Sequence, residues 1–192
     1  TFEDSRKAYF LSAQRHNISL SGQHLIKAGP FQFSAAMQVN YNSDFGLGFY
    51  PAINTGYRFL GNQKLFASYN RSFRFPSFTD LYYRLGGARG SQDLEQERSN
   101  NYELGYRFSG NGWYSTISVF HRGGTSIIDW TQACDTCDLI ANNSGDVNFT
   151  GLEFSLRKNL KEQEKTAWFK FLELSYSYLQ SSSPSQMTVY RS

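Results

Sequence analysis

Residues 64–108, KLFASYNRSFRFPSFTDLYYRLGGARGSQDLEQERSNNYELGYRF, decide the fold. The stretch begins and ends with alternating apolar and polar residues. In the clearer, final run, Tyr102, Leu104, Tyr106 and Phe108 alternate with Asn101, Glu103, Gly105 and Arg107. A period of two is typical of a β-strand with one apolar and one polar face. The segment between the runs is rich in Arg, Tyr and Gly, and a connection this long is usually functional or disordered. We therefore predict two strands joined by a long loop.

The same alternation recurs on both sides of this stretch and predicts about eight strands. Residues 17–27 are ambiguous, because they either extend the first strand or form a polar turn. Residues 42–49 carry two glycines and an aspartate, which indicate a loop. Pro51 is expected at the start of the next strand, where its missing N–H does least harm. The predicted strands are residues 7–18, 31–41, 50–59, 64–73, 98–109, 113–122, 147–158 and 166–180.

The connections between these strands alternate in length. Short turns are predicted near Gly29, Gly61, Gly110 and Glu162, and longer connections near Asp44, Leu85 and Asp135. Outer-membrane barrels have short periplasmic turns and longer extracellular loops, and a tilted strand needs about 9–11 residues to cross the membrane. The expected fold class is all-β, with antiparallel strands in up-and-down order. The sheet is expected to be wholly antiparallel, with its long loops on one side.

Composition narrows the class of protein. The chain has 192 residues, enough for one domain or a large piece of one. No apolar run approaches the roughly 18 residues of a transmembrane helix, and no signal peptide is visible. The net charge of +3 is too small to indicate nucleic-acid binding. No Ser-His-Asp set, metal-ligand spacing or phosphate loop is present, so we expect neither an enzyme nor a cofactor or metal site.

A family resemblance supports the barrel interpretation. Residues 72–83, SFRFPSFTDLYY, resemble the SFR-P-F-DLY signature of TonB-dependent outer-membrane receptors. That signature precedes a GNP-L-PE-S-YE-GY segment, which residues 90–106 match in order and spacing, with Gln92 and Gln96 in place of two prolines. The chain is most similar to the cobalamin-receptor-like and siderophore-receptor-like members. The resemblance implies that residues 1–192 are part of a large transmembrane β-barrel, a fragment without the plug domain.

The resemblance also implies a function and partners. Receptors of this family lie in the outer membrane of Gram-negative bacteria and take up a scarce large solute, such as a metal chelate or a corrinoid. The implied partners are outer-membrane lipid, the solute, and the plug domain and TonB through the intact receptor. Barrels of this family commonly close on a strand that ends in an aromatic residue. This sequence ends on Arg191 and Ser192, so we expect an interior fragment of a longer receptor. Its first and last strands, near Tyr9 and Tyr176, are then not expected to pair with each other.

Two sets of residues are candidates for functional contacts. On the long loops, the candidates for ligand contact are Arg74, Tyr82, Tyr83, Arg84, Arg89 and Trp130. On the polar faces, the candidates for lumen-facing contact with the plug are Glu103, Arg107, Glu153, Arg157 and Glu173. A lipid-facing arginine at mid-bilayer would cost about 2–4 kcal/mol, and opposite charges on neighbouring strands can pair in the lumen. Ordinary surface loops and a solvated sheet face explain the same residues.

The two cysteines lie in the sequence Cys134-Asp135-Thr136-Cys137. This spacing is compatible with a redox motif or half of a zinc site, but no second cysteine pair or βαβ pattern accompanies it. A disulfide at a loop tip is the preferred interpretation for an oxidising cell surface, and free thiols are the alternative.

Two other functions remain compatible with the strand pattern. The first is a self-contained small β-barrel that binds an apolar ligand, with its apolar face inward. The second is an outer-membrane structural or adhesion barrel without uptake. A continuous hydrogen-bonded ladder between the first and last strands would favour the small barrel.

Overall fold

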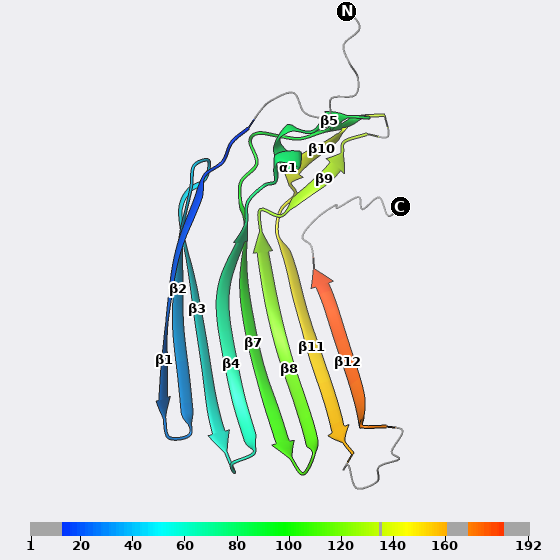
Figure 1. The fold of residues 1–192 in the computed structure, drawn as a ribbon. Coiled ribbons are helices and arrows are strands. Elements are labelled where there is room, and N and C mark those ends of the chain that lie inside the picture. The colour runs from blue at the N-terminus through cyan, green and yellow to red at the C-terminus, as the bar shows by residue number, and fades with distance from the viewer. Residues whose placement is uncertain (1–12, 135, 161–168, 183–192) are drawn as a thin grey trace, which may run out of the picture.

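The computed structural model describes residues 13–134, 136–160 and 169–182. Eight long strands form one sheet in the order β1-β2-β3-β4-β7-β8-β11-β12, and every neighbouring pair is antiparallel (Figure 1). This confirms the predicted up-and-down architecture. The strands are β1 (Asn17–Ala28), β2 (Phe31–Asn42), β3 (Gly46–Phe59), β4 (Gln63–Arg74), β7 (Glu97–Gly110), β8 (Trp113–Thr125), β11 (Val147–Asn159) and β12 (Phe171–Ser182).

The register of the strands separates an apolar face from a polar face. One row across the sheet joins Ala67, Leu104, Val119, Leu152 and Tyr178. The next row joins Ser68, Glu103, Phe120 and Gly151 on the other side. The apolar side is open, since Leu104 is 56% exposed and Leu174 is 60% exposed. An apolar surface of this extent marks a membrane or protein interface.

The sheet does not close on itself. β1 and β12 stand at its two opposite edges and do not pair with each other. This agrees with the expectation of an arc, and it leaves the small closed barrel without support. A hydrogen-bonded ladder between the first and last predicted strands would have favoured the small barrel. The predicted first strand around Leu11 lies outside the described residues.

The first strand was predicted in the wrong place. Residues 13–16 form no regular structure, and residues 7–12 lie outside the described part of the chain. β1 instead occupies Asn17–Ala28, the segment left ambiguous by the sequence, and all of it pairs with β2. Its apolar period is interrupted by Gly22 and His24, so the pairing with β2 decides its conformation.

The predicted loop at residues 42–49 is also wrong. β2 ends at Asn42 and β3 begins at Gly46, which leaves a three-residue turn. The Asn42 side-chain oxygen accepts hydrogen bonds from the backbone N–H groups of Asp44 (3.0 Å) and Phe45 (3.3 Å) and so stabilises the tight turn. The two genuinely long connections, near Leu85 and Asp138, lie at the same end of the sheet as this turn, opposite Gly61, as predicted (Figure 1).

Pro51 lies inside β3 rather than at its start. Pairing between β3 and β4 begins only at Ala52 and Asn70, so β3 no longer has β4 as a neighbour at Pro51. A proline is tolerated where the ladder has ended on one side. The result is a split between β3 and β4 at the loop end of the sheet.

The two long loops form a second, smaller sheet. Its strands are β5 (Arg84–Leu85), β6 (Ala88–Arg89), β10 (Leu139–Asn143) and β9 (Ile128–Gln132), in that order, next to the helix α1 (Phe78–Tyr82). β6 and β10 are parallel, so the prediction of wholly antiparallel pairing is wrong here. The reason is that this pair joins strands from two separate loops rather than consecutive strands. In the described part of the chain, no helix has the length and apolar character to cross a membrane.

A small apolar core holds the two loops together. Leu81 and Leu94 from the first loop pack with Ile128 and Ala141 from the second, and all four are buried. The loops therefore form one packed unit at the end of the sheet, as Figure 1 shows.

Candidate functional site

Arg74 connects the ends of β4 and β7 to both long loops. Its Nε and Nη2 atoms donate to the two carboxylate oxygens of Glu97, at 2.7 and 2.6 Å. Its Nη1 atom donates to Asp80 at 3.4 Å, and the same Glu97 accepts from the backbone N–H of Ile128 at 2.8 Å. The guanidinium predicted to contact a ligand is thus bound to carboxylates of this chain.

Asp80 belongs to the cap of helix α1. Ser77 donates to the Asp80 carboxylate from its backbone N–H (2.9 Å) and its hydroxyl (2.8 Å), and the Asp80 N–H donates back to the hydroxyl (3.1 Å). This capping box satisfies N–H groups that a helix start leaves unpaired. Burial alone would raise the pKa of Asp80, but hydrogen bonds from Ser77 and Trp130 and the charge of Arg74 outweigh it. The pKa of Asp80 is therefore lowered from its ordinary value of 3.8.

Acid is expected to loosen this loop. A carboxyl group whose pKa is lowered by folding stabilises the folded state while it is ionised. The contribution of Asp80 is complete above its ordinary pKa of 3.8 and is lost as the pH falls through the lower folded value. We expect amide hydrogen-exchange protection of residues 77–83 to fall between about pH 5 and pH 2. In Asp80→Asn this part of the pH dependence should be absent, and an unchanged profile would contradict the assignment.

The six predicted loop residues divide into three partly buried aromatic residues and three exposed arginines. Tyr82 and Trp130 pack against the apolar core of the loops, and Tyr83 meets Trp130 edge-on with 6.1 Å between ring centroids. Arg84 and Arg89 are exposed and lie directly opposite each other on the β5–β6 ladder. Like charges in such a pair destabilise it unless an anion lies between them. These two arginines are therefore the best candidates for contact with an acidic solute.

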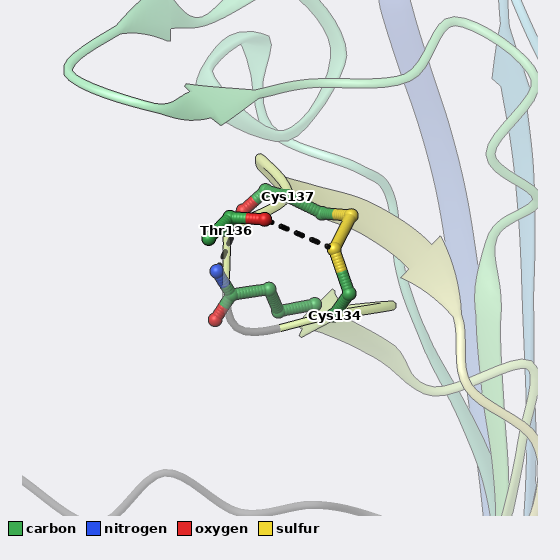
Figure 2. The surroundings of a disulfide bond; sticks show 4 residues. Cys134, Thr136 and Cys137 are labelled. Atoms are coloured by element: carbon green, nitrogen blue, oxygen red, sulfur yellow. Dashed lines mark hydrogen bonds between the residues drawn. A yellow bond between two sulfur atoms is a disulfide. The ribbon is translucent and has the colours of Figure 1, made fainter.

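A disulfide closes the tip of the β9–β10 hairpin. Cys134 and Cys137 are bonded, with their Cα atoms 5.1 Å apart (Figure 2). The Cys137 N–H donates to the Cys134 carbonyl at 3.0 Å, and the Gln132 side chain donates to the Cys137 carbonyl at 2.6 Å. The bond restricts the tip of a hairpin whose strand β10 pairs with β6 of the other loop, where Ile140 lies opposite Arg89. Among the described residues no group of three or more His, Cys, Asp or Glu side chains is placed to hold a metal ion.

The five predicted lumen residues share the polar face of the sheet. Glu103, Arg107 and Glu153 line one recess of about 500 Å³ together with Thr116 and Ser118. None of the five forms a salt bridge with another residue that the structure describes. The ion pairing considered from the sequence is thus not observed between described residues.

Arg157 does not form an ion pair with Glu173, although the two residues face each other on neighbouring strands. Its Nε atom instead donates to the Asn159 side chain at 3.0 Å, and its guanidinium lies 4.1 Å from the centroid of Phe171. Among the described residues, the charged side chains of the polar face are therefore largely without ion pairs.

Comparison with known proteins identifies the family. The model of the TonB dependent receptor-like β-barrel matches residues 3–190. The chain belongs to this family. It is 23% identical to the hemophilin receptor of Acinetobacter baumannii over 152 residues, which cover 74% of this chain and 14% of that protein. It is 26% identical over 133 residues to the vitamin B12 transporter BtuB of Photobacterium profundum, covering 69% of this chain and 21% of that one.

Solved receptor structures have the same fold. The siderophore receptor PirA from Pseudomonas aeruginosa superimposes with a TM-score of 0.74 at 20% identity, over 88% of this chain and 32% of that chain. A variant of the ferric enterobactin receptor PfeA from the same organism, in complex with enterobactin, gives 0.67 at 19% identity, over 77% and 25%. This chain therefore spans only part of the length of these receptors, and its open sheet is an arc of the receptor barrel.

A cluster of aromatic side chains at the loop end of the sheet was not predicted from the sequence. At the split between β3 and β4, Tyr50 stacks on Phe73 with 3.8 Å between centroids, and Phe45 stacks on Phe75 at 5.2 Å. Arg15 completes the cluster, since its guanidinium donates hydrogen bonds to the Asp44 carboxylate (2.9 Å) and to the Pro76 carbonyl oxygen (2.7 Å). The aromatic residues of SFRFPSF were a visible signal, but their partners lie too far away in the sequence to be assigned.

Proposed function

We propose that this chain supplies part of the wall and two external loops of an outer-membrane receptor of a Gram-negative bacterium. The receptor takes up a scarce large solute, a metal chelate or a corrinoid. The observation that carries the proposal is the family match over residues 3–190, on a sheet whose apolar face is open. Relatives named as receptors and transporters support uptake over a purely structural barrel and over an enzyme.

Each part of the structure has a role in this proposal. The apolar face contacts outer-membrane lipid, and the polar face lines the lumen. Glu103 and Glu153, which line one recess, contact the plug domain of the intact receptor, and uptake is driven through TonB. Arg84 and Arg89 contact acidic groups of the solute, and the disulfide between Cys134 and Cys137 holds the neighbouring loop tip.

Growth on supplied solutes tests the proposal. The full-length receptor that contains this chain is produced in a Gram-negative strain lacking its own receptors. Individual ferric chelates and a corrinoid are then supplied under iron or corrinoid limitation. We expect growth on at least one solute, and none after TonB is deleted. Growth on no solute, or growth that persists without TonB, would overturn the uptake proposal.

The paired loop arginines provide a residue-level prediction. A hydrogen bond to a charged group contributes about 1.5–3 kcal/mol, so Arg84→Gln together with Arg89→Gln should weaken binding of an acidic solute by about tenfold or more. Lys170→Gln, an exposed cation at the opposite end of the sheet, is the matched control and should bind normally. Titration with the solute identified by growth measures both variants. Equal affinity of the double variant and the wild type would remove the arginines from the solute site.

A further inference from the structure

A row of three cations crosses the polar face at the short-turn end of the sheet. Arg58 of β3 lies opposite Lys64 of β4, and Lys64 lies opposite Arg107 of β7. We call these three residues the basic row. Directly opposite side chains have Cβ atoms about 4.5–5.5 Å apart, and like charges so placed repel each other. A row of this kind therefore requires an anionic partner or costs stability.

Lys64 and Arg107 of the basic row each contact a residue of another kind on a different strand. Lys64 lies across Gly56 and donates to the Gln32 side chain of β2 at 3.3 Å. The Arg107 guanidinium lies 5.4 Å from the centroid of Phe66. None of the three forms a salt bridge with a residue in the described ranges. The nearest acid on β7 is Glu103, four residues or about 13 Å along the strand.

Two small recesses adjoin the basic row. One, of about 170 Å³, is lined by Lys27, Gln32, Arg58 and Lys64. The other, of about 180 Å³, is lined by Lys64, Arg107, Ser34 and Ser68 among others. Lys64 lines both. Each recess has room for the head group of one side chain and is too small for a large chelate.

We propose that the basic row binds an acidic polypeptide segment that lies across β3, β4 and β7. Charge complementarity carries this choice of occupant, and the small recesses favour separate carboxylates over one large anion. Arg58 and Arg107 are two strand spacings apart, about 10 Å. Carboxylates two or three residues apart in an extended segment span that distance. The inference rests on the polar face lining the lumen, as proposed above, but it does not depend on which solute is taken up.

Carbodiimide coupling tests the proposal. This reagent joins an amine directly to a carboxylate in contact with it, so Lys64 reports its own neighbour. Outer membranes of cells that produce the intact receptor are treated, and the coupled peptides are identified by mass spectrometry. We expect an amide bond between Lys64 and an Asp or Glu outside the eight strands described here. The adduct should disappear in Lys64→Arg, which retains the charge but cannot couple.

The neighbouring cations and a distant lysine provide the controls. Arg58→Gln and Arg107→Gln should each lower the yield at Lys64 by up to about fivefold, because each removes an ion pair with the segment. Lys158, on the apolar face of β11, donates to the Asn111 backbone carbonyl and lies over Trp113, so it should give no adduct in the wild type or in either variant. The proposal is overturned if Lys64 stays unmodified, if the partner of Lys64 is a carboxylate of this sheet, or if Lys64 couples only to citrate added as a free anion.

Discussion

Replacing Arg74 by glutamine is expected to release both long loops from the end of the sheet. The Arg74 side chain is 50% exposed, but its partners Glu97 and Asp80 are only 15% and 11% exposed. Without the guanidinium, two nearly buried carboxylates lose their counter-charge. A lost hydrogen bond to a charged group costs about 1.5–3 kcal/mol. We therefore expect amide protection in residues 75–97 to fall by about 10- to 150-fold, measured by hydrogen exchange on the intact receptor.

Two variants control this result. Arg122→Gln removes an arginine that lies over Phe120, 4.6 Å from its centroid, and forms no salt bridge within the described part of the chain. Its effect on the same amides should be within about 0.5 kcal/mol. Arg74→Gln combined with Glu97→Gln should lose less protection than Arg74→Gln alone, because it leaves one fewer unpaired charge. Unchanged protection in Arg74→Gln would show that the motif arginine does not hold the loops.

Adding a methyl group at Gly90 should displace the helix α1. A Cβ atom there would lie 2.6 Å from the carbonyl oxygen of Asp80, 2.7 Å from the carbonyl carbon of Leu81 and 2.9 Å from the backbone nitrogen of Tyr82. These are backbone atoms, so no side-chain rotation relieves the overlap. Overpacking of this kind costs about 1–3 kcal/mol. We expect Gly90→Ala to expose the first loop to limited proteolysis while the strands remain protected.

Gly22→Ala is the matched control for this substitution. Gly22 lies in β1, and no atom beyond its own residue and its two chain neighbours lies within 4 Å of the place where its Cβ would be. Its variant should be cleaved at the wild-type rate. If Gly90→Ala were equally resistant, the close approach of residue 90 to α1 would not be a requirement of the fold.

Gly90 and Arg74 each hold the first long loop in place, through close packing and through hydrogen bonds. Arg74, Ser77 and Asp80 form the polar bonds of the first loop, and Gly90 allows the chain to pass against α1. Its place on a long loop suggested Arg74 as a ligand contact, whereas the structure shows its carboxylate partners within the chain. The exposed pair of Arg84 and Arg89 lies outside this network.

The sequence by itself determined the long strands after β1 and the two faces of the sheet. Alternation with a period of two is a local property, because successive side chains of a strand point to opposite sides. The hairpin at Asn111 and Gly112 was also local, since both residues adopt positive φ, at 51° and 74°. The order of neighbouring strands followed from their short connections.

Only the tertiary structure decided the position of β1, the split beside Pro51 and the partners of Arg74. β1 depends on its pairing with β2, and the bonds from Arg74 to Glu97 join residues 23 positions apart. The parallel contact of β6 and β10 and the row formed by Arg58, Lys64 and Arg107 likewise depend on register between strands. Contacts between distant segments are selected by the free energy of the whole packed arrangement, and no local pattern of residues encodes them.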